Sequence, residues 1–173
     1  SAGCAVAARL SEDGRYRVLL LEAGGRDTNP FIHLPLGLHK LYANPRVNWM
    51  YESEPIAALN NRTSYQPRGK VLGGTSAING MIYMRGTPAD YDEWRQRGCT
   101  GWGFEDVLPF FRKSQDQERG ADALHGTGGP LKVSDQYVQS ELSEALVEAG
   151  VQAGIPRNRD FNGPTQEGAG YYQ

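Results

Sequence analysis

The chain has 173 residues, and its 18 Lys and Arg against 20 Asp and Glu give a formal net charge of −2. This balance provides no electrostatic basis for binding nucleic acid or an anionic membrane surface. Apolar runs such as Val18–Leu21 are far too short to cross a bilayer, so we predict no transmembrane segment. The two cysteines, Cys4 and Cys99, favour a reducing compartment and lack the spacing of a metal site. We expect a cytoplasmic protein, free or peripheral to the inner membrane, that binds no metal.

The N-terminal residues have the pattern of the second half of a dinucleotide-binding βαβ unit. Residues 2–11 are small and alanine-rich, which predicts a helix packed on a sheet, and residues 16–22 predict a short strand ending in Glu22. In such units the last glycine of G-x-G-x-x-G permits close helix packing, and an acidic residue about 20 positions later binds the ribose. Gly3 and Glu22 fit these two roles. We expect the first strand and the first two glycines to be missing. Taken alone, these features also occur in other α/β proteins.

The following segments predict irregular and extended structure. Residues 24–45 contain three prolines and little periodicity, which indicates a long excursion over a cofactor. Residues 48–54 alternate in polarity and predict a strand or extended ribbon, and Asn60-Asn61 predicts a turn. Trp49, within this ribbon, is equally consistent with shielding a cofactor and with filling the core.

Residues 69–80 carry the strongest functional signal, with the sequence Gly-Lys-Val-Leu-Gly-Gly-Thr-Ser-Ala-Ile-Asn-Gly. A glycine pair followed by two hydroxyl residues lets the backbone approach a large flat ligand and offers it N–H and O–H donors. Gly73-Gly74 alone is more typical of a solvent-facing turn. The apolar residues around these polar positions favour instead a loop threaded between a cofactor and a core. We interpret the loop as part of a flavin site.

Three helices and a short strand are predicted in the rest of the chain. Thr87 and Pro88 form a helix start, with Thr87 as the N-cap of a helix that continues to residue 97. Apolar spacing predicts the other two helices at 104–115 and 141–153 and a strand at 131–134. Residues 158–173 are expected to be loops. The predicted buried faces of the two later helices are Val107, Leu108, Phe110 and Phe111 in one, and Leu142, Ala145, Leu146 and Ala149 in the other.

We assign no catalytic residue to this chain. His33 and His39 lie in the irregular segment, and His125 lies in a glycine-rich loop, where a histidine more often bonds backbone than moves a proton. The acidic residues near position 90 have the pattern of a solvated helix face rather than of an acid/base pair; they are Asp90, Asp92 and Glu93.

Several motifs together resemble those of the glucose-methanol-choline (GMC) oxidoreductases. They are Ser1-Ala2-Gly3-Cys4, the segments 19–25 and 67–86, Asn48-Trp49, and Asp160-Phe161-Asn162-Gly163. The resemblance covers essentially the whole chain. It is nearest to the choline dehydrogenase and alcohol dehydrogenase branch, on residues 26–30, 90–94 and 166–168.

The resemblance implies an α/β fold: an incomplete, Rossmann-like FAD-binding domain over residues 1–173, with the start of the substrate-binding part. It implies oxidation of the CH–OH group of choline or another primary alcohol to the aldehyde, with hydride transfer to flavin N5. In this family the base is a histidine near the C-terminus of a much longer chain, partnered by a second His or Asn, and neither is in this sequence. The expected electron acceptor is a quinone or another carrier rather than oxygen.

The same resemblance implies roles for individual residues. Gly3 is expected at the pyrophosphate and Glu22 at the adenosine ribose. The residues expected to line the flavin are Val71, Gly74, Asn79, Gly80, Met81 and Ile82. Some family members tether FAD covalently through a histidine at the position of Ile78, so we expect non-covalent FAD here.

Two alternatives remain open at this stage. The chain could belong to a family member with lyase or other non-redox chemistry, as in the hydroxynitrile lyases of this family, or it could be a non-catalytic remnant. We expect residues 1–173 in isolation neither to fold stably nor to retain FAD.

Overall fold

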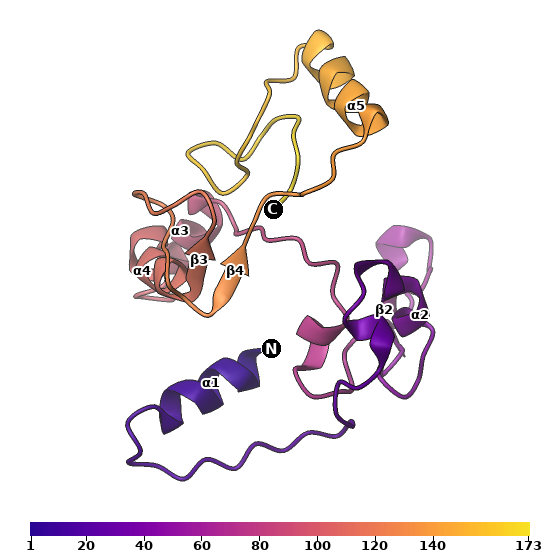
Figure 1. Cartoon of the computed structure of the whole chain (residues 1–173), viewed down its shortest axis with the longest axis vertical. Helices are drawn as coiled ribbons and strands as arrows, with labels where there is room; N and C mark the ends of the chain where they lie inside the picture. Colours follow the sequence, from indigo (N-terminus) through magenta and orange to yellow (C-terminus); the bar gives the residue numbers. More distant parts are fainter. The chain divides into compact units, whose positions relative to one another are not determined.

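The computed structural model describes the backbone of residues 1–173 and every side chain except that of Pro35. The chain divides into two compact units, Ser1–Met81 and Ile82–Gln173. Figure 1 colours the chain from indigo at the N-terminus to yellow at the C-terminus. No helix in the described part of the chain is long and apolar enough to cross a membrane.

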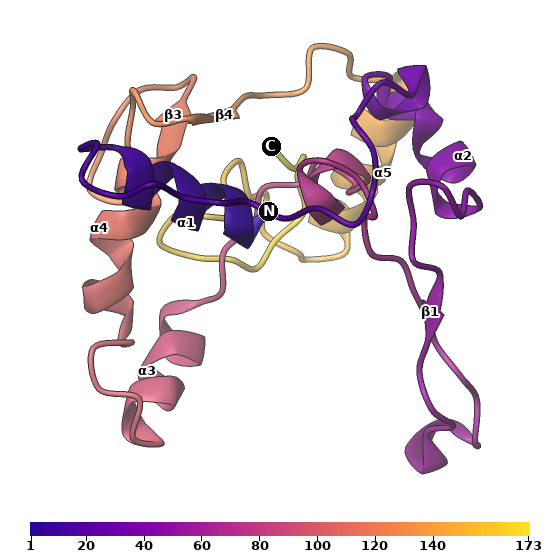
Figure 2. The same ribbon diagram turned by 90° about the horizontal axis from the view of Figure 1, so that it is seen from below.

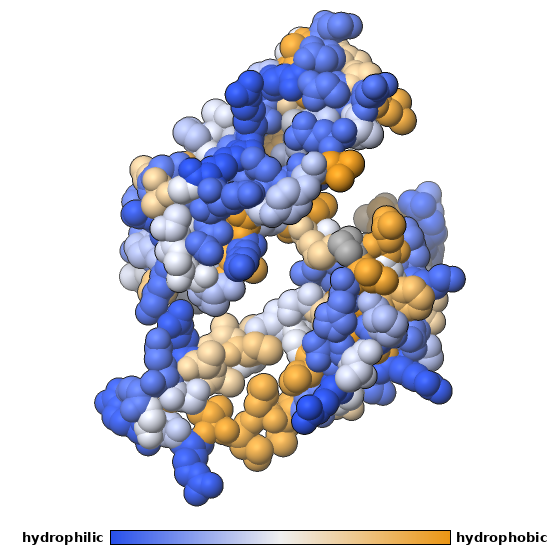
Figure 3. All heavy atoms as spheres, in the orientation of Figure 1, coloured by the Kyte–Doolittle hydropathy of each residue, from blue (hydrophilic) through white to orange (hydrophobic). Residues whose placement is uncertain are grey.

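The first unit begins with α1 (Ala2–Ser11), which confirms the predicted N-terminal helix. The strand predicted at 16–22 is wrong, because these residues have no strand partner and run as the unpaired segment that follows α1 in Figure 1. A strand is stable only when its N–H and C=O groups bond a neighbouring strand, and no described segment pairs with this one. Leu19 and Leu21 therefore remain more than 80% exposed. Figure 3 shows hydrophobic residues, in orange, along this segment.

Residues 24–45 contain more regular structure than we predicted. Two 3-10 turns, η1 (Pro30–Ile32) and η2 (Pro35–Gly37), lead into the short helix α2 (Leu38–Tyr42). The side chain of Asn29 caps η1 by accepting a hydrogen bond from the Phe31 N–H. Proline at the first position of such a turn costs no hydrogen bond, which is how a proline-rich sequence still forms helical turns.

The predicted ribbon at 48–54 is part of a hairpin. β1 (Tyr51–Glu52) pairs antiparallel with β2 (Tyr65–Gln66), and the 3-10 turn η3 (Ala57–Leu59) lies at its tip, as Figure 2 shows. The turn predicted at Asn60-Asn61 is confirmed, since both residues are left-handed, with φ of 56° and 57°. Asparagine tolerates this conformation better than most residues.

The core of the first unit is small. It consists of Leu41, Val47, Val71 and Ile78. Beside it Asn48 is buried, and its amide donates to Tyr42 O (2.9 Å) and to Tyr65 Oη (2.7 Å). Its carbonyl oxygen accepts from the Arg68 N–H (2.9 Å). Asn48 thereby joins α2, the hairpin and the start of the glycine loop.

The second unit begins with two helices whose positions were predicted correctly. α3 (Pro88–Gln96) starts with a capping box in which Thr87 and Asp90 exchange hydrogen bonds, and α4 (Phe104–Ser114) follows. Tyr91 of α3 makes an edge-to-face contact with Phe111 of α4, with ring centroids 5.7 Å apart. Asp90 therefore has a structural role in the cap, consistent with the interpretation that it is not an acid/base residue.

A short parallel pair and a third helix complete the second unit. β3 (Gln115–Gln117) continues directly from α4 and pairs in parallel with β4 (Leu131–Val133), which confirms the predicted strand. α5 (Glu141–Gln152) agrees with the predicted helix, and residues 158–173 are loops, as expected.

The predicted buried faces of α4 and α5 are partly wrong. Phe110 is 71% exposed, and Leu142 and Leu146 are 80% and 74% exposed, whereas Val147 is buried. On α5 the buried face is turned by about one residue, or ~100° of helix. This face lies against the C-terminal loop, where a Cβ placed on Gly150 would lie 3.2 Å from Ala169 Cβ and where Arg157 bonds Glu144 and Glu148.

Candidate functional site

The glycine loop at 69–80 is held in shape by backbone geometry and by its own hydroxyl groups. Gly73 and Gly74 have φ of 96° and 64°, a conformation that favours glycine, and they open the 3-10 turn η4 (Gly74–Ala77). Thr75 Oγ1 accepts from the Gly69 N–H (3.2 Å), and Ser76 Oγ donates to Gly73 O (2.6 Å). The two hydroxyl groups thus stabilise the loop itself.

The backbone of the loop packs directly against the backbone of residues 22–25. A Cβ placed on Gly24 would lie 1.9 Å from Lys70 O, so only glycine fits there. Gly25 forms a parallel bridge with Val71, and its carbonyl accepts from the Leu72 N–H (2.9 Å). Glu22 begins this contact region, and its Oε1 accepts from the Gly24 N–H (2.8 Å).

The N-terminus of α1 reaches the same loop. The Ser76 N–H donates to Ser1 Oγ (3.0 Å), and Figures 1 and 2 both show the N-terminus beside η4. A Cβ on Gly74 would lie 3.0 Å from Ser1 N, and one on Gly3 would lie 3.7 Å from Leu20 Cδ1. The structure therefore brings Gly3, Glu22 and the glycine loop into one region, at a helix N-terminus that favours negative charge.

The residues predicted to line a flavin fall into two groups. Val71 is fully buried in the core, and Gly74 lies in η4. Asn79, Gly80, Met81 and Ile82 form an exposed strip, with Met81 and Ile82 58% and 59% exposed. We call residues 79–82 the exposed strip. It presents adjacent apolar side chains to its surroundings.

The exposed strip contains a strained residue. Met81 has φ of 55°, which is uncommon for a residue other than glycine, asparagine or aspartate. The conformation is held by Asn79, whose Oδ1 accepts from the Met81 N–H (3.0 Å). Strain of this kind costs about 1–3 kcal/mol and is found preferentially at functional sites.

Trp49 does not fill the core. Its ring is exposed, stacks on Tyr51 with centroids 5.8 Å apart, and lies 4.6 Å from Lys70 Nζ in a cation–π contact. Lys70 belongs to the glycine loop, so this aromatic pair and the loop are adjacent. The interpretation that Trp49 fills the core is therefore wrong, and the shielding of a cofactor stays a prediction.

A pocket of about 690 Å³ lies in the same unit. It is lined by Gly25 and Val71 from the contact region, and by three basic residues, Arg26, Lys40 and Arg46. Its volume is in the range of small-molecule sites, and its cationic side chains favour an anionic ligand. Sequence reasoning missed this pocket because its walls come from the irregular residues 25–47.

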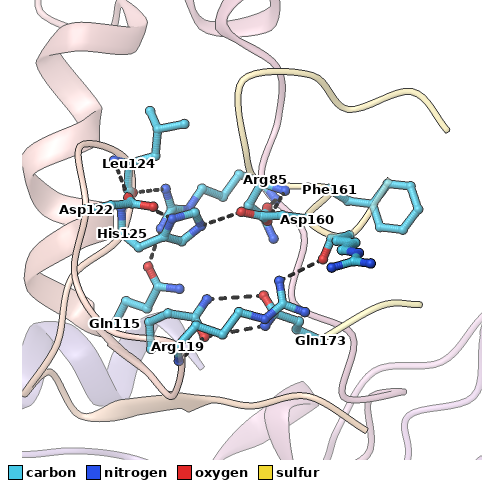
Figure 4. Close-up of polar contacts among 12 residues, drawn as sticks. Arg85, Gln115, Arg119, Asp122, Leu124, His125, Asp160, Phe161 and Gln173 are labelled. Atoms are coloured by element: carbon cyan, nitrogen blue, oxygen red, sulfur yellow. Dashed lines mark hydrogen bonds and ion pairs between the residues drawn. The ribbon is translucent and has the colours of Figure 1, made fainter. Parts of the chain in front are cut away.

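In the second unit, His125 lies at the centre of a polar network that sequence reasoning also missed (Figure 4). Only 3% of its side chain is exposed, and Nδ1 lies 2.9 Å from Asp122 Oδ1 while Nε2 lies 3.4 Å from Asp160 Oδ2. The expectation that His125 bonds backbone is therefore wrong; it contacts two carboxylates instead. Its place in a glycine-rich loop gave no signal of this, because Asp160 is distant in sequence.

The network perturbs the acidity of its exposed carboxylate. Burial acts to raise the pKa of Asp122, but the N–H groups of Leu124 and His125 and the His125 ring bond the carboxylate and together lower its pKa. Elsewhere in the unit, hydrogen bonds from Arg157 lower the pKa of Glu144. These shifts are those of structural ion pairs.

No three His, Cys, Asp or Glu side chains gather in a way that could hold a metal ion within the described residues. His125 is hydrogen-bonded to Asp122 through Nδ1, and its Nε2 lies within ion-pair distance of Asp160 on the other side of the ring.

Comparison with known families decides the affiliation of the chain. The model of the family described as GMC oxidoreductase matches residues 3–173. The chain belongs to the GMC oxidoreductase family. The resemblance read from the sequence motifs, and the α/β fold class that it implies, are confirmed.

Two curated relatives of this GMC chain have similar identities. An oxygen-dependent choline dehydrogenase of Sinorhizobium fredii is 50% identical over 170 residues, covering 98% of this chain and 31% of the relative. An alcohol dehydrogenase (acceptor) of Pseudomonas putida is 48% identical over 174 residues, covering 100% of this chain and 32% of the relative. The GMC chain thus spans about a third of the length of the relatives that it matches.

Solved structures agree with this affiliation. Pyridoxine 4-oxidase from Mesorbium loti superposes on the GMC chain with a TM-score of 0.86 and 40% identity, over 94% of this chain and 32% of that one. A formate oxidase superposes with a TM-score of 0.83 and 26% identity, over 96% of this chain and 31% of that one. The fold described above is therefore that of known GMC oxidoreductases.

Proposed function

We propose that this GMC chain forms part of the FAD site of an enzyme that oxidises the CH–OH group of an alcohol to the aldehyde. Choline or another primary alcohol is the proposed substrate. The family match over residues 3–173, at about half identity to a choline dehydrogenase, carries this proposal. The activity is assigned to the complete enzyme, of which these residues are proposed to be the FAD-binding region with the start of the substrate-binding part.

The residues of the first unit fit FAD in charge and in shape. FAD is a dianionic, elongated molecule with a flat apolar ring system at one end. The α1 N-terminus beside η4 and the pocket with Arg26, Lys40 and Arg46 supply positive potential for a pyrophosphate. The exposed strip supplies apolar contacts for a ring system, and a Cβ on Gly80 would meet nothing within 4 Å, so the backbone is open to a ligand there.

The proposed roles of individual residues follow from this placement. Gly3 permits close approach at the pyrophosphate, and Glu22, exposed beside the contact region, accepts hydrogen bonds from the adenosine ribose. Gly74, with φ of 64°, permits the backbone turn with which η4 begins. Asn79, Gly80, Met81 and Ile82 contact the flavin, whereas Val71 supports them from the core through its backbone bridge to Gly25. FAD supplies the hydride acceptor, N5, when bound.

These residues would orient the cofactor and exclude water from it. The proton of the alcohol would be removed by a base supplied by another part of the enzyme, because His125 is buried in its own network. Neither His33 nor His39 lies in the glycine loop or the exposed strip.

We propose that FAD is held without a covalent bond. Ile78 carries no nucleophilic atom, and its side chain is buried in the core with Leu41 and Val47. Acid precipitation of the complete enzyme tests this: the yellow colour is expected in the supernatant, and flavin that stays with the protein pellet would contradict the proposal.

The proposed electron acceptor is a quinone or another carrier rather than oxygen. The relatives differ in this respect by name, one being oxygen-dependent and another an acceptor-linked dehydrogenase. Stopped-flow mixing of the reduced enzyme with air-saturated buffer or with a soluble quinone separates the two. Reoxidation is expected to be at least about tenfold faster with quinone, and equal or faster reoxidation by oxygen would overturn the assignment.

We also propose a cytoplasmic location, free or peripheral to the inner membrane. The two free, exposed cysteines Cys4 and Cys99 support a reducing compartment. Fractionation of the native host, with washing of membranes at high salt, checks this: the protein is expected in the cytoplasmic fraction or in the wash.

The decisive experiment uses the complete open reading frame that encodes this chain. The purified protein is expected to be yellow, and adding choline or a primary alcohol without oxygen is expected to bleach the flavin absorbance with formation of one aldehyde per flavin. A yellow protein that no alcohol bleaches would indicate lyase or other non-redox chemistry. A colourless protein that does not take up added FAD would indicate a non-catalytic remnant.

A further inference from the structure

Arg85 is a buried cation whose partners in this chain are neutral. Its side chain is 6% exposed, and the guanidinium donates to Gln115 Oε1 (2.5 Å), to Leu124 O (2.7 Å) and to Tyr83 Oη (3.0 Å). None of the described carboxylates forms an ion pair with it. Burying a charge in this way is costly unless its donors are all bonded, so the position of Arg85 is strongly defined.

Two aromatic rings complete the surroundings of this guanidinium. Its Cζ lies 5.1 Å from the centroid of Phe111 and 5.4 Å from that of Tyr83. Cation–π contacts of this kind stabilise a desolvated guanidinium. Arg85 thus joins α4, β3 and the loop before His125 to the chain that precedes α3, as Figure 4 shows in part.

One asparagine, Asn162, is hydrogen-bonded twice to the backbone around Arg85, and we call this pair of bonds the clasp. Asn162 Oδ1 accepts from the Arg85 N–H (2.8 Å), and Asn162 Nδ2 donates to Tyr83 O (3.0 Å). These two bonds, to alternate residues of an extended segment, are the pair that a neighbouring β-strand would make. Tyr83 N donates to Gln173 O (2.7 Å), and Gln166 Nε2 donates to Arg85 O (2.8 Å).

The clasp is itself fixed to the His125 network. The Asn162 N–H donates to Asp160 Oδ1 (2.9 Å), and the other oxygen of Asp160 lies 3.4 Å from His125 Nε2. The sequence Asp160-Phe161-Asn162-Gly163 has no role in the proposed function. Its Asp160 lies beside His125, and its Asn162 is hydrogen-bonded to the backbone of residues 83–85.

We propose that Asn162 and Arg85 are positioning residues that set the location of Ile82, the part of the exposed strip that belongs to the same unit, against the flavin. The inference rests on the proposed function, because it takes residues 79–82 to contact FAD. The clasped residue Tyr83 directly follows Ile82, the last residue of the strip. Successive Cα atoms are only about 3.8 Å apart, so a shift of the backbone at Tyr83 also shifts Ile82.

The test compares two buried asparagines of the same loop in the complete enzyme. Asn162→Ala removes both bonds to residues 83–85. Asn158→Ala is the matched control, since Asn158 is also buried and bonds Thr165 O, Glu167 O and the Asp160 N–H, but nothing in residues 83–85. Both variants are expected to lower the thermal midpoint of the apoprotein, by a similar amount.

The two variants are expected to differ at the flavin. Asn162→Ala should raise the Kd for FAD about tenfold, as measured by quenching of FAD fluorescence, and should change the circular dichroism of the bound flavin. Hydrogen exchange at residues 82–85 of the apoprotein should speed up in this variant and not in Asn158→Ala. Equal FAD affinity, flavin spectrum and exchange in both variants would overturn the proposal and leave Asn162 with a purely structural role.

A second variant covers the case in which Asn162→Ala does not fold. Arg85→Lys keeps the charge but loses the planar fork that bonds three acceptors at once, so it is expected to shift the flavin spectrum in the same direction with a smaller loss of stability. An unchanged flavin spectrum in a folded Arg85→Lys enzyme contradicts the proposal. Failure of the wild-type enzyme to bind FAD contradicts the proposed function instead, so the two failures are distinguishable.

Discussion

At the scale of single residues, the exposed strip owes its shape to one side-chain bond. Asn79 Oδ1 accepts from the Met81 N–H and holds Met81 at φ of 55°. The sequence motif identified Asn79 as a candidate ligand contact, whereas the structure gives it a local structural bond as well. A polar residue in a glycine-rich loop can do both, because its amide N–H₂ group remains available.

We predict that Asn79→Ala weakens FAD binding more than it weakens folding. Loss of the bond to Met81 should cost about 1 kcal/mol of stability, and release of the strained backbone should raise the Kd for FAD about tenfold in titrations of the apoenzyme. Asp13→Ala removes a bond of the same type, which the Arg15 N–H donates to Asp13 Oδ1 (3.0 Å), together with the Asp13–Arg15 ion pair, far from the strip in sequence. The control should leave the Kd unchanged, and equal effects of the two changes would argue against a flavin contact.

A second residue-scale prediction concerns acid stability. Because hydrogen bonds lower the pKa of Asp122 below its ordinary 3.8 in the folded state, this carboxylate stabilises the fold above that value. Its contribution is lost as the pH falls through the folded pKa. Thermal midpoints measured from about pH 5 downward should therefore fall less steeply for Asp122→Asn than for wild type. Parallel curves would show that the contacts with His125 do not favour the charged carboxylate.

At the scale of elements, helix positions followed from the sequence but helix orientations did not. α3 begins at the predicted cap because Thr87 and Asp90 satisfy each other's backbone groups locally. α5 has the predicted extent, yet the face it buries includes Val147 and Gly150, and Gly150 packs against Ala169 of the C-terminal loop. Apolar spacing identifies a helix face that can be buried. The residues that pack against the helix determine which face is buried.

We predict a contrast between two substitutions on α5 in the complete enzyme. Val147→Ala removes buried methyl groups and should cost about 2 kcal/mol, seen as a lower thermal midpoint. Leu142→Glu changes an exposed position and should alter the midpoint little. A large loss for Leu142→Glu would mean that the apolar stripe is covered in the complete enzyme, and that the orientation inferred from the spacing is right after all.

At the scale of the whole molecule, the two units have little core of their own. The core of the first unit consists of four residues, while Leu19, Leu21 and Met81 are largely exposed. A domain that leaves this much apolar surface in water gains little from burial to offset the entropy of folding. The chain also covers only 31% of its choline dehydrogenase relative.

We therefore predict that residues 1–173, expressed alone, neither fold cooperatively nor retain FAD. Heating should give no sigmoidal transition in circular dichroism, and the product should be colourless after gel filtration in the presence of FAD. A soluble yellow product would contradict this prediction.

The amino-acid sequence alone determined the family, the cofactor hypothesis and the positions of the local elements. Those features depend on contiguous residues: the glycine loop at 69–80, the cap at Thr87, and the helices at 2–11 and 104–115. Only the tertiary structure decided that residues 16–22 stay unpaired, that Val71 faces the core, and that His125 contacts Asp122 and Asp160. Strand pairing, burial and ionic contacts depend on residues that are distant in sequence. No local sequence pattern determines which distant residue makes the contact.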